Sequence, residues 1–145
     1  MTDDDPYAPR PLAGWYYAGA SASLLFMALG CAMYVLHVTT DPASLALDER
    51  AAFLAVPGWL TAVNAVAVWS GLFGAILLLM RRRIAEPVLL VSLVATIIWL
   101  GGLMAVPQLR ASLSSSDLVV ALVIAAIVWT IYWFARHSRQ RGWLR

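Results

Sequence analysis

Four long apolar runs alternate with short polar stretches along the chain. The runs cover residues 15–37, 57–80, 87–106 and 118–135, and none of them contains Asp, Glu, Lys or Arg. Each is close to the roughly 20 apolar residues that a helix needs to cross the hydrocarbon core of a bilayer. Because backbone groups in lipid need internal partners, and the period-two alternation of a membrane barrel is absent, the runs predict helices. The expected fold is all-α: a single integral membrane domain over residues 1–145, a four-helix transmembrane bundle made of two helical hairpins.

The first polar connection is the only one long enough to have structure of its own. Asp41 followed by Pro42 is typical of a helix N-cap and a first helical position. Leu47 and Leu54 then fall on one face of a helix. The pattern predicts a short amphipathic helix over residues 42–56 that lies at the membrane interface, with both leucines facing inward.

The other polar segments are predicted to have little structure of their own. Residues 81–86 allow only a tight turn between the second and third helices. Residues 108–116 form a polar, serine-rich loop, at the end of which Ser116 or Asp117 is available to cap the fourth helix. Residues 136–145 are predicted to form a tail beyond the bundle.

The arginines predict the orientation. The chain has ten basic residues, and all are arginines. With four spans, the two termini and the middle connection share one side, and that side carries eight of the ten: Arg10, Arg81, Arg82, Arg83, Arg136, Arg139, Arg141 and Arg145. The other side carries Arg50 and Arg110. The positive-inside rule therefore predicts that both termini are cytoplasmic. The run of residues 81–83 is also placed to attract anionic lipid headgroups.

Composition agrees with a membrane protein and excludes other classes. Hydrophobic residues make up 62% of the chain and charged residues 12%, whereas a soluble domain carries about a quarter charged residues. The lipid bilayer is therefore the expected partner of most of the surface. Nucleic-acid binding is excluded, because no soluble segment offers a basic face. Cys31 is the single cysteine, so no intramolecular disulfide can form.

Aromatic residues are expected at two depths. Trp15, Tyr16 and Tyr17 begin the first apolar run, where rings prefer the headgroup region. Trp69 and Trp99 fall near the middle of their runs and are predicted to pack against neighbouring helices.

The apolar runs hold no obvious catalytic group. An enzyme or an ion-coupled carrier usually keeps an ionisable residue inside the membrane. His37, at the end of the first run, is open to two interpretations: a proton sensor or metal ligand, or a hydrogen-bonded interfacial histidine. The second is preferred because no other His or Cys lies at ligand spacing. We therefore expect no catalytic residue, no metal site and no cofactor.

Small residues follow one another at helical spacing in the second run. Ala67, Gly71 and Ala75 recur every four residues, and Asn64 precedes them by about one turn. Small residues at this spacing let another helix approach closely, and an intramembrane Asn can hydrogen-bond across such an interface. The pattern predicts a helix-packing seam, with a partner either in this chain or in another molecule.

The few polar side chains inside the runs support a second interpretation. Asn64, Ser92, Thr96 and Thr130 are the possible lining groups of a path for a neutral solute. Four helices are few for enclosing a pathway, so transport would require a dimer.

Several short motifs support a resemblance. They are Asp41-Pro42, Glu49-Arg50, Pro57-Gly58-Trp59, Leu77-Leu78-Leu79 before the arginines, and Arg141-Gly142-Trp143-Leu144-Arg145 at the end. With them the chain resembles a group of poorly characterised small four-helix bacterial inner-membrane proteins, some of which carry the label "sugar transporter". The resemblance implies membrane transport without supplying functional residues.

Two functional hypotheses follow. The first is a non-enzymatic accessory or interaction protein, either a homo-oligomer or a small subunit bound to another membrane protein. The second is a small transporter of a neutral solute such as a sugar, acting as a dimer. The charge-free runs and the small-residue seam favour the first.

Overall fold

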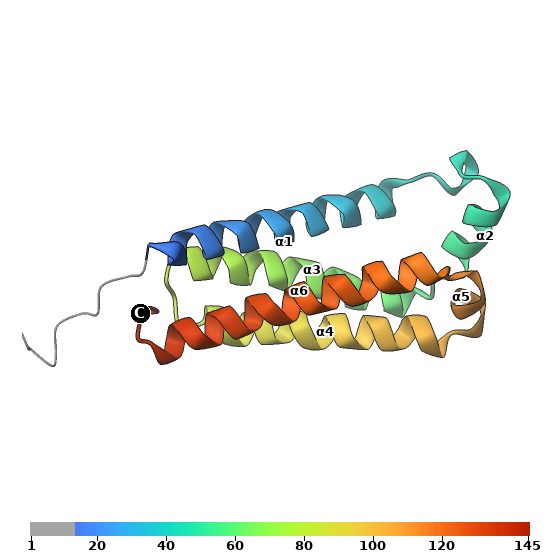
Figure 1. Cartoon of the computed structure of the whole chain (residues 1–145). Helices are drawn as coiled ribbons and strands as arrows, with labels where there is room; N and C mark the ends of the chain where they lie inside the picture. The colour runs from blue at the N-terminus through green and yellow to red at the C-terminus, as the bar shows by residue number, and fades with distance from the viewer. Residues whose placement is uncertain (1–13) are drawn as a thin grey trace, which may run out of the picture.

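A computed structural model describes residues 14–145, so the expectation for Arg10 lies outside the described part. Its helices are α1 (Trp15–Thr39), η1 (Pro42–Ser44), α2 (Leu47–Leu54), α3 (Gly58–Leu79), α4 (Ala85–Ala105), α5 (Pro107–Ser112) and α6 (Ser115–Gln140). By length and composition α1, α3, α4 and α6 can each cross a membrane. The protein is therefore a multi-pass membrane protein, and the predicted all-helical four-helix bundle is confirmed (Figure 1).

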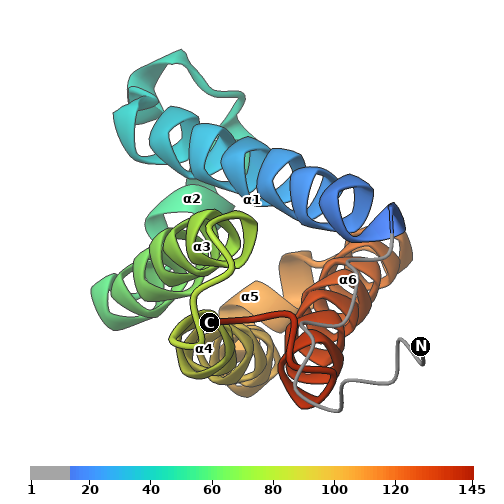
Figure 2. The same cartoon turned by 90° about the vertical axis from the view of Figure 1, so that its left-hand side faces the viewer.

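The four long helices follow one another around the bundle. α1 packs along α3, α3 along α4, and α4 along α6 (Figure 2). One end of the bundle carries the start of α1, the α3–α4 turn and the end of α6, and it is called here the arginine end. The other end carries α2 and α5 and is called the connector end (Figure 1).

The helix bounds differ from the apolar runs most at α6. This helix begins at Ser115 and not near Leu118, because Ser114 and Asp117 form a capping box in which each side chain accepts from the other's backbone N–H. The N-cap was predicted at Ser116 or Asp117, but the N-cap residue is Ser114. Asp117 is the third residue of the helix and completes the capping box. α6 also continues into the predicted tail as far as Gln140.

The first connection contains two short helices where one was predicted. Asp41 caps only a single 3₁₀ turn, with its carboxylate accepting from the Ala43 N–H at 2.9 Å. α2 then starts separately at Leu47. Leu47 and Leu54 are both exposed and do not pack on the bundle, whereas Phe53 packs against His37 of α1. That the two leucines face the membrane stays a prediction.

The second connection is not simply a polar loop. Pro107 occupies the first turn of α5, where its missing N–H costs no helical hydrogen bond. Leu109 of this six-residue helix is buried. α5 therefore closes the connector end below α2.

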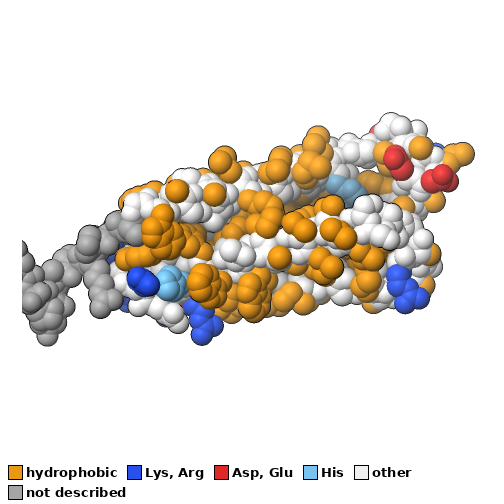
Figure 3. All heavy atoms as spheres, viewed as in Figure 1, with side chains coloured by type: hydrophobic (Ala, Val, Ile, Leu, Met, Phe, Trp, Pro, Cys, Tyr) orange, Lys and Arg blue, Asp and Glu red, His pale blue; other side chains and the backbone are white. Residues whose placement is uncertain are grey.

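The outer surface of the long helices is apolar, as contact with a bilayer requires. Large hydrophobic side chains cover the outside of the long helices, whereas charged groups lie near the two ends (Figure 3). Trp69 belongs to this outer surface with 51% of its area exposed, so its predicted packing role is wrong. Trp99 is partly buried and lines the interior.

Candidate functional site: a cleft between α1 and α6

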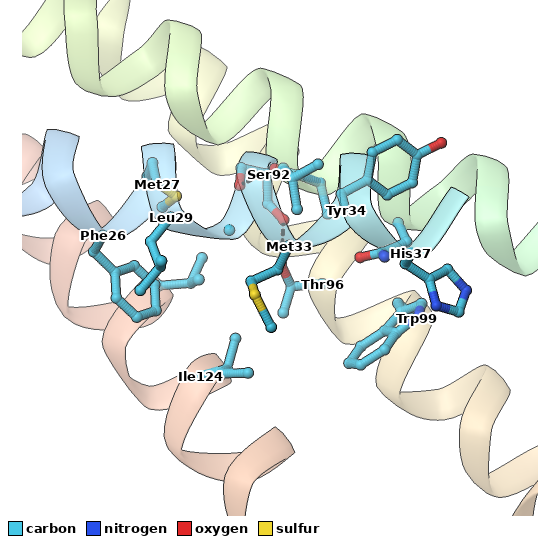
Figure 4. Close-up of a pocket in the computed structure, with 15 residues that line it drawn as sticks. Phe26, Met27, Leu29, Met33, Tyr34, His37, Ser92, Thr96, Trp99 and Ile124 are labelled. Carbon is cyan, nitrogen blue, oxygen red and sulfur yellow. Dashed lines mark hydrogen bonds between the residues drawn. The ribbon is translucent and has the colours of Figure 1, made fainter. Parts of the chain in front are cut away.

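All four long helices contribute to one cavity of about 410 Å³. Its apolar wall includes Phe26, Met27 and Met33 of α1, which Ile124 faces from α6 (Figure 4). Val128 of α6 also lines it. A volume in this range is typical of pockets that hold small molecules.

The cavity opens sideways between α1 and α6. Leu29 and Met33 on α1 line it yet are 62% and 61% exposed, and Ile124 on α6 is 36% exposed. These side chains therefore form a rim and not a closed wall. In a membrane this rim faces hydrocarbon, so the cavity communicates with lipid.

At the arginine end the same two helices touch. The rings of Trp15 and Phe134 have centroids 5.6 Å apart, as do those of Tyr16 and Phe134. A Cβ at Gly19 would lie 3.0 Å from Phe134 Cζ, so glycine permits this approach. Tyr16 is fully buried at this end and donates its hydroxyl to the Leu78 carbonyl at 2.6 Å. The cleft is thus closed at the arginine end.

The chain beyond α6 seals this closed end. Gly142 adopts φ 72°, the left-handed conformation that ends many helices, and turns the chain back. Trp143 and Leu144 are then buried, and the Trp143 ring lies 5.5 Å from Trp15 and 5.8 Å from Tyr16. The prediction of a tail beyond the bundle is therefore wrong for the last residues, because they pack into the bundle.

Two of the three consecutive arginines hold this returning segment. Arg81 donates its Nε to the Trp143 carbonyl at 2.9 Å, and Arg83 donates its Nε to the Leu144 carbonyl at 3.4 Å. The backbone N–H of Arg83 also donates to the Arg145 carbonyl at 3.0 Å. Arg82 makes no such contact among the described residues. The side chains predicted only as topology and lipid determinants thus also bind the end of the chain.

The predicted lining residues divide into two groups. Asn64, Ser92 and Thr96 all line the cavity. Thr130 does not join them, because it is exposed on the outside of α6 and donates to the Ala126 carbonyl at 2.8 Å. A membrane helix is apolar on all sides, so its residue pattern does not show which face of α6 points inward.

The hydroxyl groups in the cavity are already engaged. Ser92 donates to the Ala67 carbonyl at 2.7 Å and so links α4 to α3. Thr96 donates to the Ser92 carbonyl at 2.8 Å within α4. Both can still accept a hydrogen bond, but neither has a donor to spare for a ligand.

Other polar groups gather toward the connector end of the cavity, and they remain free. Tyr34, His37, Asn64 and Trp99 line this part (Figure 4). Within residues 14–145, none of these four side chains makes a hydrogen bond. His37, Asn64 and Trp99 also line a smaller adjoining cavity of about 150 Å³, together with Thr61. The site therefore has an apolar part and a part with unused donors and acceptors.

The small residues of α3 lie on the inner side of the bundle. Ala67, Gly71 and Ala75 are buried. A Cβ at Gly71 would lie 2.6 Å from Met27 Sδ of α1 and 2.8 Å from Ser92 Oγ of α4. The neighbours of these small residues are therefore helices of this chain. Asn64 lines the cavity together with Ala67.

The described residues contain no group of three or more His, Cys, Asp or Glu side chains that could hold a metal ion. The nearest charged groups to the cavity are Glu49 and Asp117, which line a separate hollow beside His37 at the connector end.

No protein family, no curated protein and no solved structure matches the chain. The site's own chemistry must therefore carry the functional argument.

Proposed function

We propose that this chain is a non-enzymatic accessory protein of the bacterial inner membrane, which acts by binding another membrane component in the cleft between α1 and α6. The observation that carries the proposal is a cavity that opens sideways toward lipid and is closed at the arginine end. Such a cavity receives its occupant from within the membrane. An occupant that enters between α1 and α6 passes the exposed rim of Leu29 and Met33.

The absence of charged groups from the cavity lining supports binding over chemistry. No Asp, Glu, Lys or Arg is among the residues that line it. General acid–base catalysis and nucleophilic catalysis both need a positioned reactive group. His37 is the one imidazole in the lining, and its ring lies tilted against that of Phe53 with centroids 4.7 Å apart. It has no carboxylate or nucleophile beside it within the cavity.

The proposed orientation rests on the arginines. Arg81, Arg82 and Arg83 lie at the same end as the last turn of α6, and this end is proposed to be cytoplasmic. The cleft then opens in the outer half of the membrane. As a subunit of a complex or as a homo-oligomer, the protein would meet its partner there.

The alternative is a small transporter of a neutral solute such as a sugar, acting as a dimer. One observation favours it, namely that Asn64, Ser92 and Thr96 line the same cavity. Against it, the hydroxyl donors of Ser92 and Thr96 are used inside the bundle. A sugar would leave several hydroxyls unpaired in this cavity, and burial of each unpaired polar group is costly.

A crosslinking experiment tests the proposal. A photoreactive amino acid replaces Met33, which lies on the rim, or Leu25, which is equally exposed on α1 but does not line the cavity. The protein is irradiated in native membranes and purified in a gentle detergent, and its adducts are identified. An accessory role predicts a reproducible adduct from position 33 and not from position 25. A dimer that moves sugars in proteoliposomes, and fails to do so after Asn64→Leu, would establish the transporter instead.

A further inference from the structure

The cleft changes in chemical character along its length. Toward the middle of the bundle its wall is formed by Met27, Met33 and Val128. Toward the connector end it offers the Asn64 carboxamide and the Trp99 indole N–H. An occupant that satisfies both parts must be amphipathic.

The unused hydrogen-bonding groups indicate the nature of the polar part. The Asn64 carboxamide supplies two donors and an acceptor, and the Trp99 indole supplies one donor. Both side chains are partly buried, and neither makes a hydrogen bond within residues 14–145, so both are available to a ligand. Since no Asp, Glu, Lys or Arg lines the cavity, no permanently charged side chain there can pair with a full charge on the occupant, and His37 is the one ionisable base in the lining. The matching headgroup is uncharged and carries hydroxyl or carbonyl oxygens.

The shape of the cleft indicates how far the occupant extends. The rim is open at Leu29 and Met33, but Trp15 and Tyr16 meet Phe134 at the arginine end. A helix that crosses the whole membrane cannot lie along a cleft that is closed at the arginine end. A lipid occupies one half of the bilayer and can enter sideways through the rim.

We infer that the cleft is a binding site for a neutral amphipathic lipid. Its hydroxyl or carbonyl headgroup contacts Asn64 and Trp99 near the connector end, and part of its hydrocarbon lies against Met27 and Val128. This inference rests on the proposed function, because it names the component that the accessory protein binds. In the proposed orientation the lipid belongs to the outer leaflet.

Two glycines provide a matched pair of variants. Gly30 lines the cavity, and a Cβ there meets only Val68 Cγ1 at 3.9 Å, an ordinary contact. Gly101 on α4 is exposed, and a Cβ there has no neighbour within 4 Å. Gly30→Leu therefore fills the cleft, whereas Gly101→Leu makes the same change of residue outside it. Thr130→Val is the control for the polar variant Asn64→Leu, because Thr130 lies on the outer face.

The test measures lipid adducts by native mass spectrometry. The purified full chain in mild detergent is titrated with dioleoylglycerol, and with dioleoylphosphatidylglycerol as the charged comparison. The wild type, Gly101→Leu and Thr130→Val are expected to retain dioleoylglycerol. Gly30→Leu is expected to lose it, and Asn64→Leu to bind about fivefold more weakly, the effect of one neutral hydrogen bond. Thermal unfolding verifies that each variant is folded. If Gly30→Leu does not fold, the affinity of Asn64→Leu for dioleoylglycerol still tests the inference.

Three results overturn the inference. In the first, both lipids bind equally and Gly30→Leu has no effect, which indicates lipid on the outer surface only. In the second, no neutral lipid binds, but a protein adduct at position 33 is lost in Gly30→Leu; the proposed accessory function then survives with a different occupant. In the third, neither a lipid nor a protein is found at the cleft, and the proposed function fails together with the inference.

Discussion

Substitution of Gly71 by alanine tests a close contact of three helices with a single added methyl group. The new Cβ would lie 2.6 Å from Met27 Sδ and 2.8 Å from Ser92 Oγ. Met27 is flexible and lines the cavity, so its thioether can move aside. Ser92 cannot move as easily, because it is buried and its hydroxyl is bound to the Ala67 carbonyl at 2.7 Å. The crowding at Ser92 is therefore expected to decide the outcome.

The size of the effect follows from two opposing contributions. Replacement of glycine by alanine inside a helix favours the helix by about 1 kcal/mol. Overpacking a close contact costs about 1–3 kcal/mol. Gly101→Ala gains the first contribution without the second, since a Cβ there has no neighbour within 4 Å. Gly71→Ala is thus expected to unfold with a free energy about 1–3 kcal/mol lower than Gly101→Ala.

A double-mutant cycle assigns the cost to Ser92. Ser92→Ala alone removes the hydrogen bond to the Ala67 carbonyl and is expected to destabilise by about 0.5–1.5 kcal/mol. It also removes the oxygen atom that crowds the new Cβ at Gly71. The second substitution should therefore cost less in the Ser92→Ala background, with a coupling free energy of at least about 0.5 kcal/mol.

The assay is equilibrium unfolding in mixed micelles by titration with SDS, followed by far-ultraviolet circular dichroism and by gel filtration in mild detergent. If Gly71→Ala is as stable as Gly101→Ala, the close approach of α1, α3 and α4 at this position is refuted. If the two substitutions at Gly71 and Ser92 add without coupling, the crowding lies at Met27 instead. A change of oligomeric state without loss of stability would place the contact between molecules.

Two further predictions concern the arginine end. Alkaline phosphatase should be active when it is fused after Ser44 or Ser114 and inactive when it is fused after Arg83, because the arginines should keep their end of the bundle in the cytoplasm. The reverse pattern of activity would show that the protein has the opposite orientation. Trp143→Ala should release the chain after α6, because the buried ring contacts Trp15 and Tyr16, and trypsin should then cleave after Arg141 many times faster. Trp129→Ala, which removes an exposed ring from the same helix, should leave this cleavage slow, and equal rates in both variants would contradict the packing.

The sequence predicts the long helices well because each rests on a local property. An uninterrupted apolar run must be helical in lipid, whatever its neighbours are. Local capping rules also act at the ends, where Asp41 and Asp117 do form caps. Their exact roles were missed, because the N-cap of α6 is Ser114 and not one of the residues nearer the apolar run.

The candidate site was predicted less well because it depends on how each helix is rotated about its axis. In a soluble bundle the polar face shows which side is exposed, but lipid-facing and buried sides are both apolar here. Trp69 and Thr130 therefore looked like interior residues and lie outside. The docking of Trp143 could not be predicted either, since it depends on contacts with Trp15 and Tyr16 at the other end of the chain.

The closed end and the open cleft are two parts of one arrangement. α1 follows α3 along the bundle, and its contact with α6 at the arginine end is made by aromatic rings. The buried Trp143 holds the first turn of α1 in that contact, and Arg81 holds Trp143 through its carbonyl. The α3–α4 turn, the start of α1 and the end of α6 are thereby tied together at one point. The distance between α1 and α6 can therefore vary most at the connector end, where Phe53 of α2 packs on His37 beside the polar part of the cleft.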